Sequence, residues 1–217
     1  IGFGKASTID PSQTFDGLSL MLVLCSFLLR NPFLIIFCLL AGFFNDERTL
    51  ISAFLFTLYY FQFNSQLKIN NKYPFLVFVS LIFFASGRAY MQLILSMKAP
   101  LGGVGLTTFF SQINSISIGY FMFLEGFWII VLSSIYFVWN TNKKNPLFLF
   151  IIVSFLIGSL SSFLVFDHSR SMIYSFPIIF FGLSYLKPFI SYEKLKKMII
   201  ATLISSALIP TISFGGK

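Results

Sequence analysis

The chain has 217 residues, of which 57% are hydrophobic and only 10% are charged, and its mean hydropathy is +0.87. A soluble domain carries about 25% charged residues, so this composition excludes an ordinary water-facing surface. It predicts an all-α fold, a polytopic transmembrane helical bundle that forms a single domain. The net charge of +8 is spread thinly along the chain, which favours signals for membrane orientation over a nucleic-acid partner.

Apolar segments predict eight helices, preceded by a polar N-terminal segment over residues 1–14. In chain order the expected helices cover residues 15–29, 32–44, 49–63, 74–94, 115–138, 146–166, 171–187 and 197–214. A crossing needs about 20 apolar residues, so the second and third helices are expected to span thinly, to re-enter, or to be shielded by neighbours. A kink at Pro32 could instead join the first two segments into one helix, which gives seven crossings. Because the sequence opens with Ile1, it could also be the later part of a longer protein.

Lysine and arginine predict which turns face the cytoplasm, because these residues accumulate in cytoplasmic loops. The inner turns then hold nine cations and a single acid, Glu193, whereas the opposite face holds six cations and five acids. The inner cations are Arg30, Lys68, Lys72, Lys143, Lys144, Lys187, Lys194, Lys196 and Lys197. This arrangement places residues 45–48, 95–114 and 167–170 on the non-cytoplasmic face of a membrane. A bacterial inner membrane is expected, with an organellar inner membrane as the alternative.

The first polar turn on the outer face is the stretch "NDER". Asn45 is expected to cap the following helix, with Asp46 and Glu47 near its positive end. Arg48 opposes the helix dipole, so it is expected to pair with Asp46, to reach the interface, or to bind an anionic ligand. Arg88 is expected at the same face. Three of the four arginines lie on this face, which favours planar recognition of phosphate or carboxylate.

The second polar turn, "DHSR", contains Asp167, His168 and Arg170. Arg170 begins a predicted helix and therefore needs an anion, either Asp167, an acid from another turn, or a ligand. His168 is a secondary candidate, either a solvated turn residue or a base. It is the only histidine, so no metal site is expected, and no cofactor motif is present.

Glu125 is a separate candidate, because it is expected about ten residues inside the helix over 115–138, roughly 15 Å along its axis. A carboxyl group at that depth is costly to bury. It therefore indicates either a functional residue or an essential packing contact.

The stretches "AGFFNDERTLISAFL" and "FDHSRSMIYSFPIIFFGL" resemble segments of bacterial polytopic membrane proteins of cell-envelope polysaccharide biosynthesis, which include proteins similar to the GT-C glycosyltransferases. The resemblance covers about 35 residues and differs from those enzymes in lacking an acidic loop after the first membrane helix. It implies transfer of a sugar from a polyprenyl-phosphate donor at the outer face. Asp46, Glu47 or Asp167 would be the catalytic base. The phosphate would bind to Arg48, Arg88 or Arg170, and Pro177 would occupy the helix after the second turn.

Two other functions remain open at this point. The chain could be a non-catalytic transmembrane subunit of a larger, energy-transducing complex, in which the outer charges contact other membrane subunits. It could also be a transporter with the broken segments at residues 15–44 lining a site near the membrane midplane. Membrane lipids are expected partners in each case.

Overall fold

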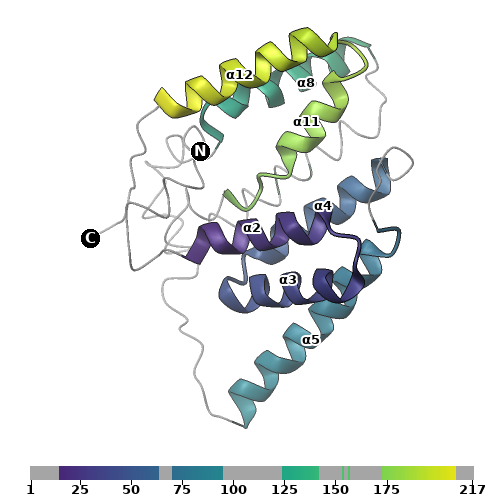
Figure 1. Ribbon diagram of the computed structural model, residues 1–217, viewed down its shortest axis with the longest axis vertical. Helices are drawn as coiled ribbons and strands as arrows, with labels where there is room; N and C mark the ends of the chain where they lie inside the picture. The colour runs from purple at the N-terminus through teal and green to yellow at the C-terminus, as the bar shows by residue number, and fades with distance from the viewer. Residues whose placement is uncertain are drawn as a thin grey trace.

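The structure is a computed structural model, and it describes residues 15–63, 70–94, 124–141, 153, 156 and 173–208. All regular secondary structure within these residues is helical, which confirms the predicted all-α class for this part of the chain. Its elements are α2 (Phe15–Leu28), α3 (Pro32–Asn45), α4 (Thr49–Phe63), α5 (Tyr73–Leu93), the 3-10 helix η4 (Glu125–Phe127), α8 (Trp128–Thr141), α11 (Ile178–Leu186) and α12 (Tyr192–Leu208). Figure 1 shows their arrangement.

The first four helices agree with the sequence prediction to within one or two residues at each end. The break between α2 and α3 is real, and it excludes a single kinked helix. Pro32 occupies the first position of α3, where its missing N–H costs nothing. The Asn31 side chain accepts a hydrogen bond from the Phe33 backbone N–H at 2.9 Å and so caps the new helix.

The later helices differ more from the prediction. In the described part of the helix expected over 171–187, Ile173 is helical, residues 174–177 form successive turns, and regular α11 begins at Ile178. Helix α12 begins five residues earlier than expected, at Tyr192, because Glu and Lys are good helix formers although they are not apolar. The helix expected over 146–166 lies outside the described residues, apart from positions 153 and 156.

The described helices pack in two groups. Helices α2, α3, α4 and α5 contact one another, while α8, α11, α12 and η4 form the second group. The groups meet where α4 faces α11, and Figure 1 shows α11 on the side of the second group that is next to the first. Side-chain hydrogen bonds tie them together: the Tyr59 and Ser184 hydroxyls share a hydrogen bond of 2.6 Å, the Ser52 hydroxyl donates to the Tyr174 carbonyl, and the Tyr174 hydroxyl donates to Asp46.

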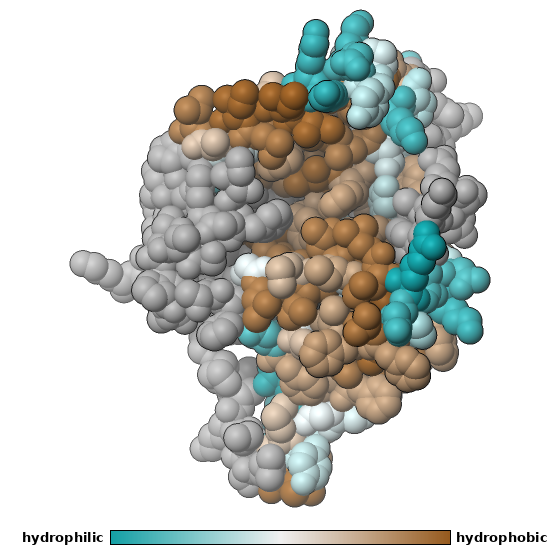
Figure 2. Space-filling model, in the orientation of Figure 1, coloured by the Kyte–Doolittle hydropathy of each residue, from teal (hydrophilic) through white to brown (hydrophobic). Residues whose placement is uncertain are grey.

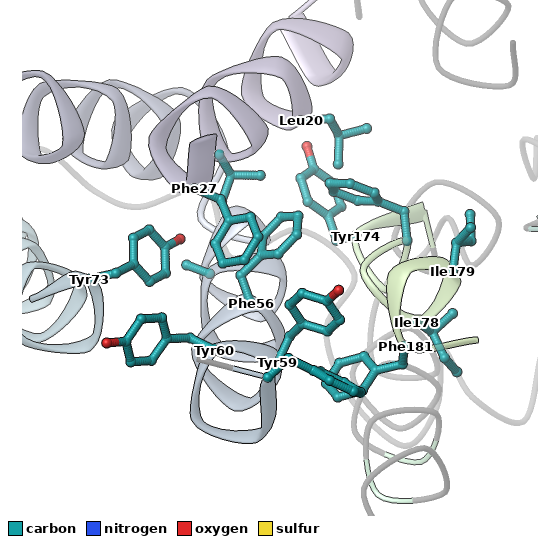
Figure 3. Close-up of a cluster of buried hydrophobic side chains, with 14 of the residues drawn as sticks. Leu20, Phe27, Phe56, Tyr59, Tyr60, Tyr73, Tyr174, Ile178, Ile179 and Phe181 are labelled. Atoms are coloured by element: carbon teal, nitrogen blue, oxygen red, sulfur yellow. The ribbon is translucent and has the colours of Figure 1, made fainter. Parts of the chain in front are cut away.

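Aromatic rings fill the space where the two groups meet (Figure 3). Phe27 stacks on Phe56 with ring centroids 4.4 Å apart, and Phe56 meets the edge of Phe176 at 5.4 Å. Tyr59 meets Phe181 edge-on at 5.1 Å. Such offset and edge-to-face pairs stabilise by about 0.5–1.5 kcal/mol each beyond the area that they bury. The interface between the groups is therefore a packed aromatic core.

The helices run back and forth, so their ends collect at two opposite ends of the structure. At one end the Asn70 side chain donates to the Arg30 carbonyl at 2.6 Å, and the Phe137 and Phe189 rings stack at 5.8 Å. At the other end the Asn45 side chain, at the end of α3, donates to Ser19 near the start of α2. In Figure 2 hydrophilic side chains gather along the right side and over the start of α12, while apolar side chains cover the helices between the ends.

Only α5, among the described helices, combines the length and the apolar composition needed to cross a bilayer alone. Four further apolar helical stretches are shorter: Gly17–Leu28, Pro32–Asn45, Thr49–Phe63 and Glu125–Asn140. A helix of 14 residues is about 21 Å long, which is less than the roughly 30 Å of a typical hydrocarbon layer.

Candidate functional site at the acid–arginine turn

The turn between α3 and α4 carries the candidate site. Three backbone bonds close it: Asp46 N–H donates to the Gly42 carbonyl at 2.9 Å, Thr49 N–H to Asp46 at 3.0 Å, and Leu50 N–H to Glu47 at 3.1 Å. The approach is close at Gly42, where an added Cβ would lie 3.1 Å from the Thr49 methyl group. The short turn therefore projects three successive charged side chains from one end of the α2–α5 group.

Asp46, rather than Asn45, has the capping role in this turn, so the sequence prediction for Asn45 is wrong. The Asp46 carboxylate accepts a hydrogen bond from the Arg48 backbone N–H at 2.9 Å. Asn45 is instead the last residue of α3, and its amide group donates to the Ser19 hydroxyl. The shift of one residue arises because α3 continues through Asn45.

Asp46 and Arg48 form a closely bound ion pair. The Arg48 Nε–H donates to the two carboxylate oxygens at 3.0 and 3.1 Å, and a terminal nitrogen of the guanidinium group contacts Oδ2. Side-chain exposure is 10% for Asp46 and 19% for Arg48. This pairing was among the alternatives expected from the sequence, and it offsets the unfavourable position of Arg48 at the start of α4.

Tyr174 completes this cluster from the other group of helices, and sequence reasoning missed it. Its hydroxyl donates to Asp46 Oδ2 at 2.7 Å, and its ring lies 5.2 Å from the centre of the Arg48 guanidinium group. Tyr174 is fully buried. The only signal in the sequence is its place, a tyrosine between the second polar turn and Pro177.

The surroundings of Asp46 oppose one another in their effect on its pKa. Burial raises the pKa, but the Arg48 hydrogen bonds and charge, together with the Tyr174 hydroxyl, outweigh it and hold the pKa below its usual value. The carboxylate is therefore ionised and its oxygens are occupied. This makes Asp46 a poor general base and a good structural anchor.

Glu47 and Arg88 form a second and more open ion pair. Arg88, from the last turns of α5, donates to Glu47 Oε2 at 2.8 Å, and its guanidinium group lies 5.6 Å from the centre of the Phe84 ring. Side-chain exposure is 66% for Glu47 and 34% for Arg88. An exposed pair of this kind contributes little to stability. Both charges therefore remain accessible to a ligand.

Glu125 is buried, as expected, but it is not inside a continuous α-helix. Its φ of 48° lies in the left-handed region, where it begins η4, and its exposure is 6%. This conformation is unfavourable for a residue other than glycine by about 1–2 kcal/mol. At Gly126 an added Cβ would lie 2.5 Å from the Thr202 carbonyl oxygen, so this glycine permits close approach of α12. The prediction of an uninterrupted helix over 115–138 is therefore wrong at Glu125.

The second predicted turn lies outside the described residues, and so do Asp167, His168 and Arg170. The same is true of residues 95–114. Among the residues that are described, no group of three or more His, Cys, Asp or Glu side chains could hold a metal ion.

No protein-family model, curated protein or solved structure matches this chain. The buried pair with Tyr174 holds the two helix groups together, while the open pair presents a carboxylate and a guanidinium group that are both accessible to a ligand.

Proposed function

We propose that this chain is a polytopic integral membrane protein that binds a polyprenyl-phosphate-linked sugar at its non-cytoplasmic face and transfers the sugar, as in GT-C-like glycosyltransferases. The observation that carries the proposal is the open Glu47–Arg88 pair. It lies next to a buried pair that fixes the turn, at the end of the helices opposite the lysine-rich end. Asp167 and Arg170 belong to the proposed site as well.

The surface of α5 supports membrane placement. Large apolar side chains on this helix are exposed, namely Phe75, Phe78, Leu81, Ile82 and Phe83. Soluble monomeric proteins rarely expose large contiguous apolar patches. Lipid chains would cover these side chains, and the shorter helices of the α2–α5 group would span the membrane beside their neighbours.

Charge supports the proposed orientation. The end that carries Arg30, Lys72 and the first lysines of α12 would face the cytoplasm. The turn with Asp46 and Glu47 would then face outward, where lipid-linked sugars would meet their acceptors. The hydrogen bond from the Asn70 side chain to the Arg30 carbonyl, between two of the turns assigned to the cytoplasm, supports this orientation.

The two acids would have different roles. Glu47 would be the general base, because its carboxylate is exposed and is held by a single arginine. Arg88 would bind the phosphate of the donor and stabilise the charge that develops on it as the glycosidic bond breaks. Asp46, Arg48 and Tyr174 would position the turn. Asp46, Glu47 and Asp167 were all expected as candidate bases, and of the two described ones Glu47 is favoured.

A comparison of single variants tests these roles in lipid nanodiscs that contain polyprenyl phosphate. We expect R88Q to weaken binding of polyprenyl phosphate by about tenfold or more, since a hydrogen bond to a charged group contributes about 1.5–3 kcal/mol. E47Q should bind the phosphate at least as well as the wild type, since it removes the competing carboxylate, but it should not transfer sugar. E193Q is the matched Glu-to-Gln control at the opposite end, and it should behave as the wild type.

One observation favours a second candidate, a non-catalytic membrane subunit. Arg48 and Arg88 each pair with a carboxylate of the chain itself, as expected for contacts that hold helices together. This candidate predicts that R88Q and E47Q leave binding of polyprenyl phosphate unchanged. It also predicts that the chain leaves a native membrane only as part of a larger assembly. That pair of results would refute the transferase proposal.

A further inference from the structure

The start of α12 carries a dense cluster of positive charge. Lys187, Lys194, Lys196 and Lys197 are all exposed, and Glu193 is the only acid between the first and last of them. Four ammonium groups and one carboxylate leave a net charge of +3 over these 11 residues. Figure 2 shows hydrophilic side chains projecting from this end of α12. We call these four lysines the lysine cluster.

Glu193 offsets only one of these four charges, and no other acid within the described residues forms an ion pair with the lysine cluster. The ion pairs there join Asp46 to Arg48 and Glu47 to Arg88, at the opposite end of the helices. Three of the lysines also lie in the first two turns of α12, where the positive end of the helix dipole disfavours a cation. An anionic partner from outside the described fold would relieve both sources of repulsion.

Aromatic side chains beside the lysine cluster indicate the kind of surface that supplies the anion. Tyr192 is 75% exposed, and Phe189 is also exposed although its ring stacks on Phe137 at 5.8 Å. A tyrosine with an apolar ring and a polar hydroxyl is typical of the membrane–water interface. Lysines that reach past such rings would lie at the level of lipid phosphates.

We propose that the lysine cluster binds the phosphate groups of anionic membrane lipids. The inference rests on the membrane placement proposed above, but not on the transferase activity, which concerns the other end. Lysine suits this partner because its compact ammonium group forms point-charge contacts with phosphate without a fixed geometry. The second group of helices would then be held against the cytoplasmic lipid surface through α12.

The test uses the full chain in vesicles of phosphatidylcholine that contain a minor fraction of phosphatidylglycerol. Trp139, in the last turn of α8, lies at the same end as the lysine cluster and is a natural fluorescence donor. Energy transfer to dansyl-labelled phosphatidylglycerol is compared with transfer to dansyl-labelled phosphatidylcholine. We expect a preference for the anionic lipid that decreases as salt is added, because salt screens exposed charges.

Two triple variants separate charge from structure. K194Q/K196Q/K197Q should weaken the association with phosphatidylglycerol by up to about fivefold per lysine, from the roughly 1 kcal/mol that each basic residue contributes near an anionic surface. K194R/K196R/K197R keeps the charge and should keep the preference. Equal transfer to the two lipids in the wild type, or an unchanged preference in the Gln variant, would overturn the inference.

Resistance to alkaline extraction separates failure of this inference from failure of the proposed membrane placement. A chain that stays in vesicles at high pH but shows no lipid preference contradicts only the role of the lysine cluster. A chain that washes out of neutral vesicles, yet binds anionic vesicles in a salt-dependent manner, contradicts the integral placement and still supports the lysine cluster.

Discussion

The substitution D46N tests whether the acid–arginine turn joins the two groups of helices. Asp46 accepts hydrogen bonds from Arg48 and from Tyr174, and its side chain is only 10% exposed. The variant keeps the size of the side chain but removes its charge. Removal of one member of a fully buried pair costs about 3–5 kcal/mol. Because Arg48 retains some access to solvent, we expect a loss of about 2–3 kcal/mol in the free energy of unfolding.

Y174F isolates the contact between the groups. It deletes the hydroxyl that donates to Asp46 but keeps the ring against Arg48. One hydrogen bond to a charged acceptor contributes about 1.5–3 kcal/mol, so Y174F should lower the free energy of unfolding by nearly as much as D46N. The matched control is Y192F, since Tyr192 is 75% exposed and should tolerate loss of its hydroxyl.

Reversible unfolding in mixed micelles, followed by tryptophan fluorescence, measures these effects. Trp128 and Trp139 both lie in α8. The fluorescence signal therefore reports on the second group of helices, whereas Asp46 lies in the first group. In the double variant D46N/Y174F the two losses should not add, with a coupling of about 1 kcal/mol. Full additivity, or a loss in D46N no greater than in Y192F, would refute the role of the turn as a link.

Three further predictions follow from the same contacts. The pKa of Asp46 is held below its usual value. The stabilisation by the ionised carboxylate is therefore fully present above the unfolded-state pKa of about 4 and is lost as pH falls through the folded-state pKa. The difference in free energy of unfolding between the wild type and D46N should shrink only below about pH 4 in unfolding titrations. G126A should lower the free energy of unfolding by about 2 kcal/mol or more, because its Cβ would meet the Thr202 carbonyl at 2.5 Å; an unchanged unfolding midpoint would contradict that packing. Y59F should cost about 1 kcal/mol in the same assay, since it breaks the hydrogen bond to Ser184, and S184A should cost a similar amount.

Local signals in the sequence were sufficient to place the first four helices. Pro32 and Asn31 together specify a helix start, since one fixes the backbone angle and the other supplies the cap. An apolar run does not reveal the start of α12, because Glu and Lys favour helix without being apolar. Local chemistry therefore predicts boundaries well where a cap or a proline is present, and poorly where a polar helix end reaches beyond the apolar stretch.

The acidic turn, its arginines and the Asp46–Arg48 pairing could be predicted from the sequence, but the two contacts that join this turn to distant parts of the chain could not. Charge counting placed Arg88 at the same end as the acidic turn, and the structure joins it to Glu47 across 41 residues of chain. The bond from Tyr174 to Asp46 spans 128 residues. No local pattern specifies such a contact, because it depends on how α4 and α11 pack. The strained backbone of Glu125 was hidden for a similar reason, since the close approach of α12 is a tertiary feature.

The difference between the two ion pairs determines how the turn should be interpreted. Both pairs join a carboxylate to an arginine, and from the sequence any of the four side chains could be chemical or structural. Burial separates them: the inner pair is enclosed with Tyr174, while the outer pair is largely open to its surroundings. A ligand phosphate would have to break several hydrogen bonds to reach Arg48, but only one carboxylate contact to reach Arg88. Any anion that binds at this turn should therefore compete with Glu47, which is why the E47Q variant distinguishes a binding site from a structural turn.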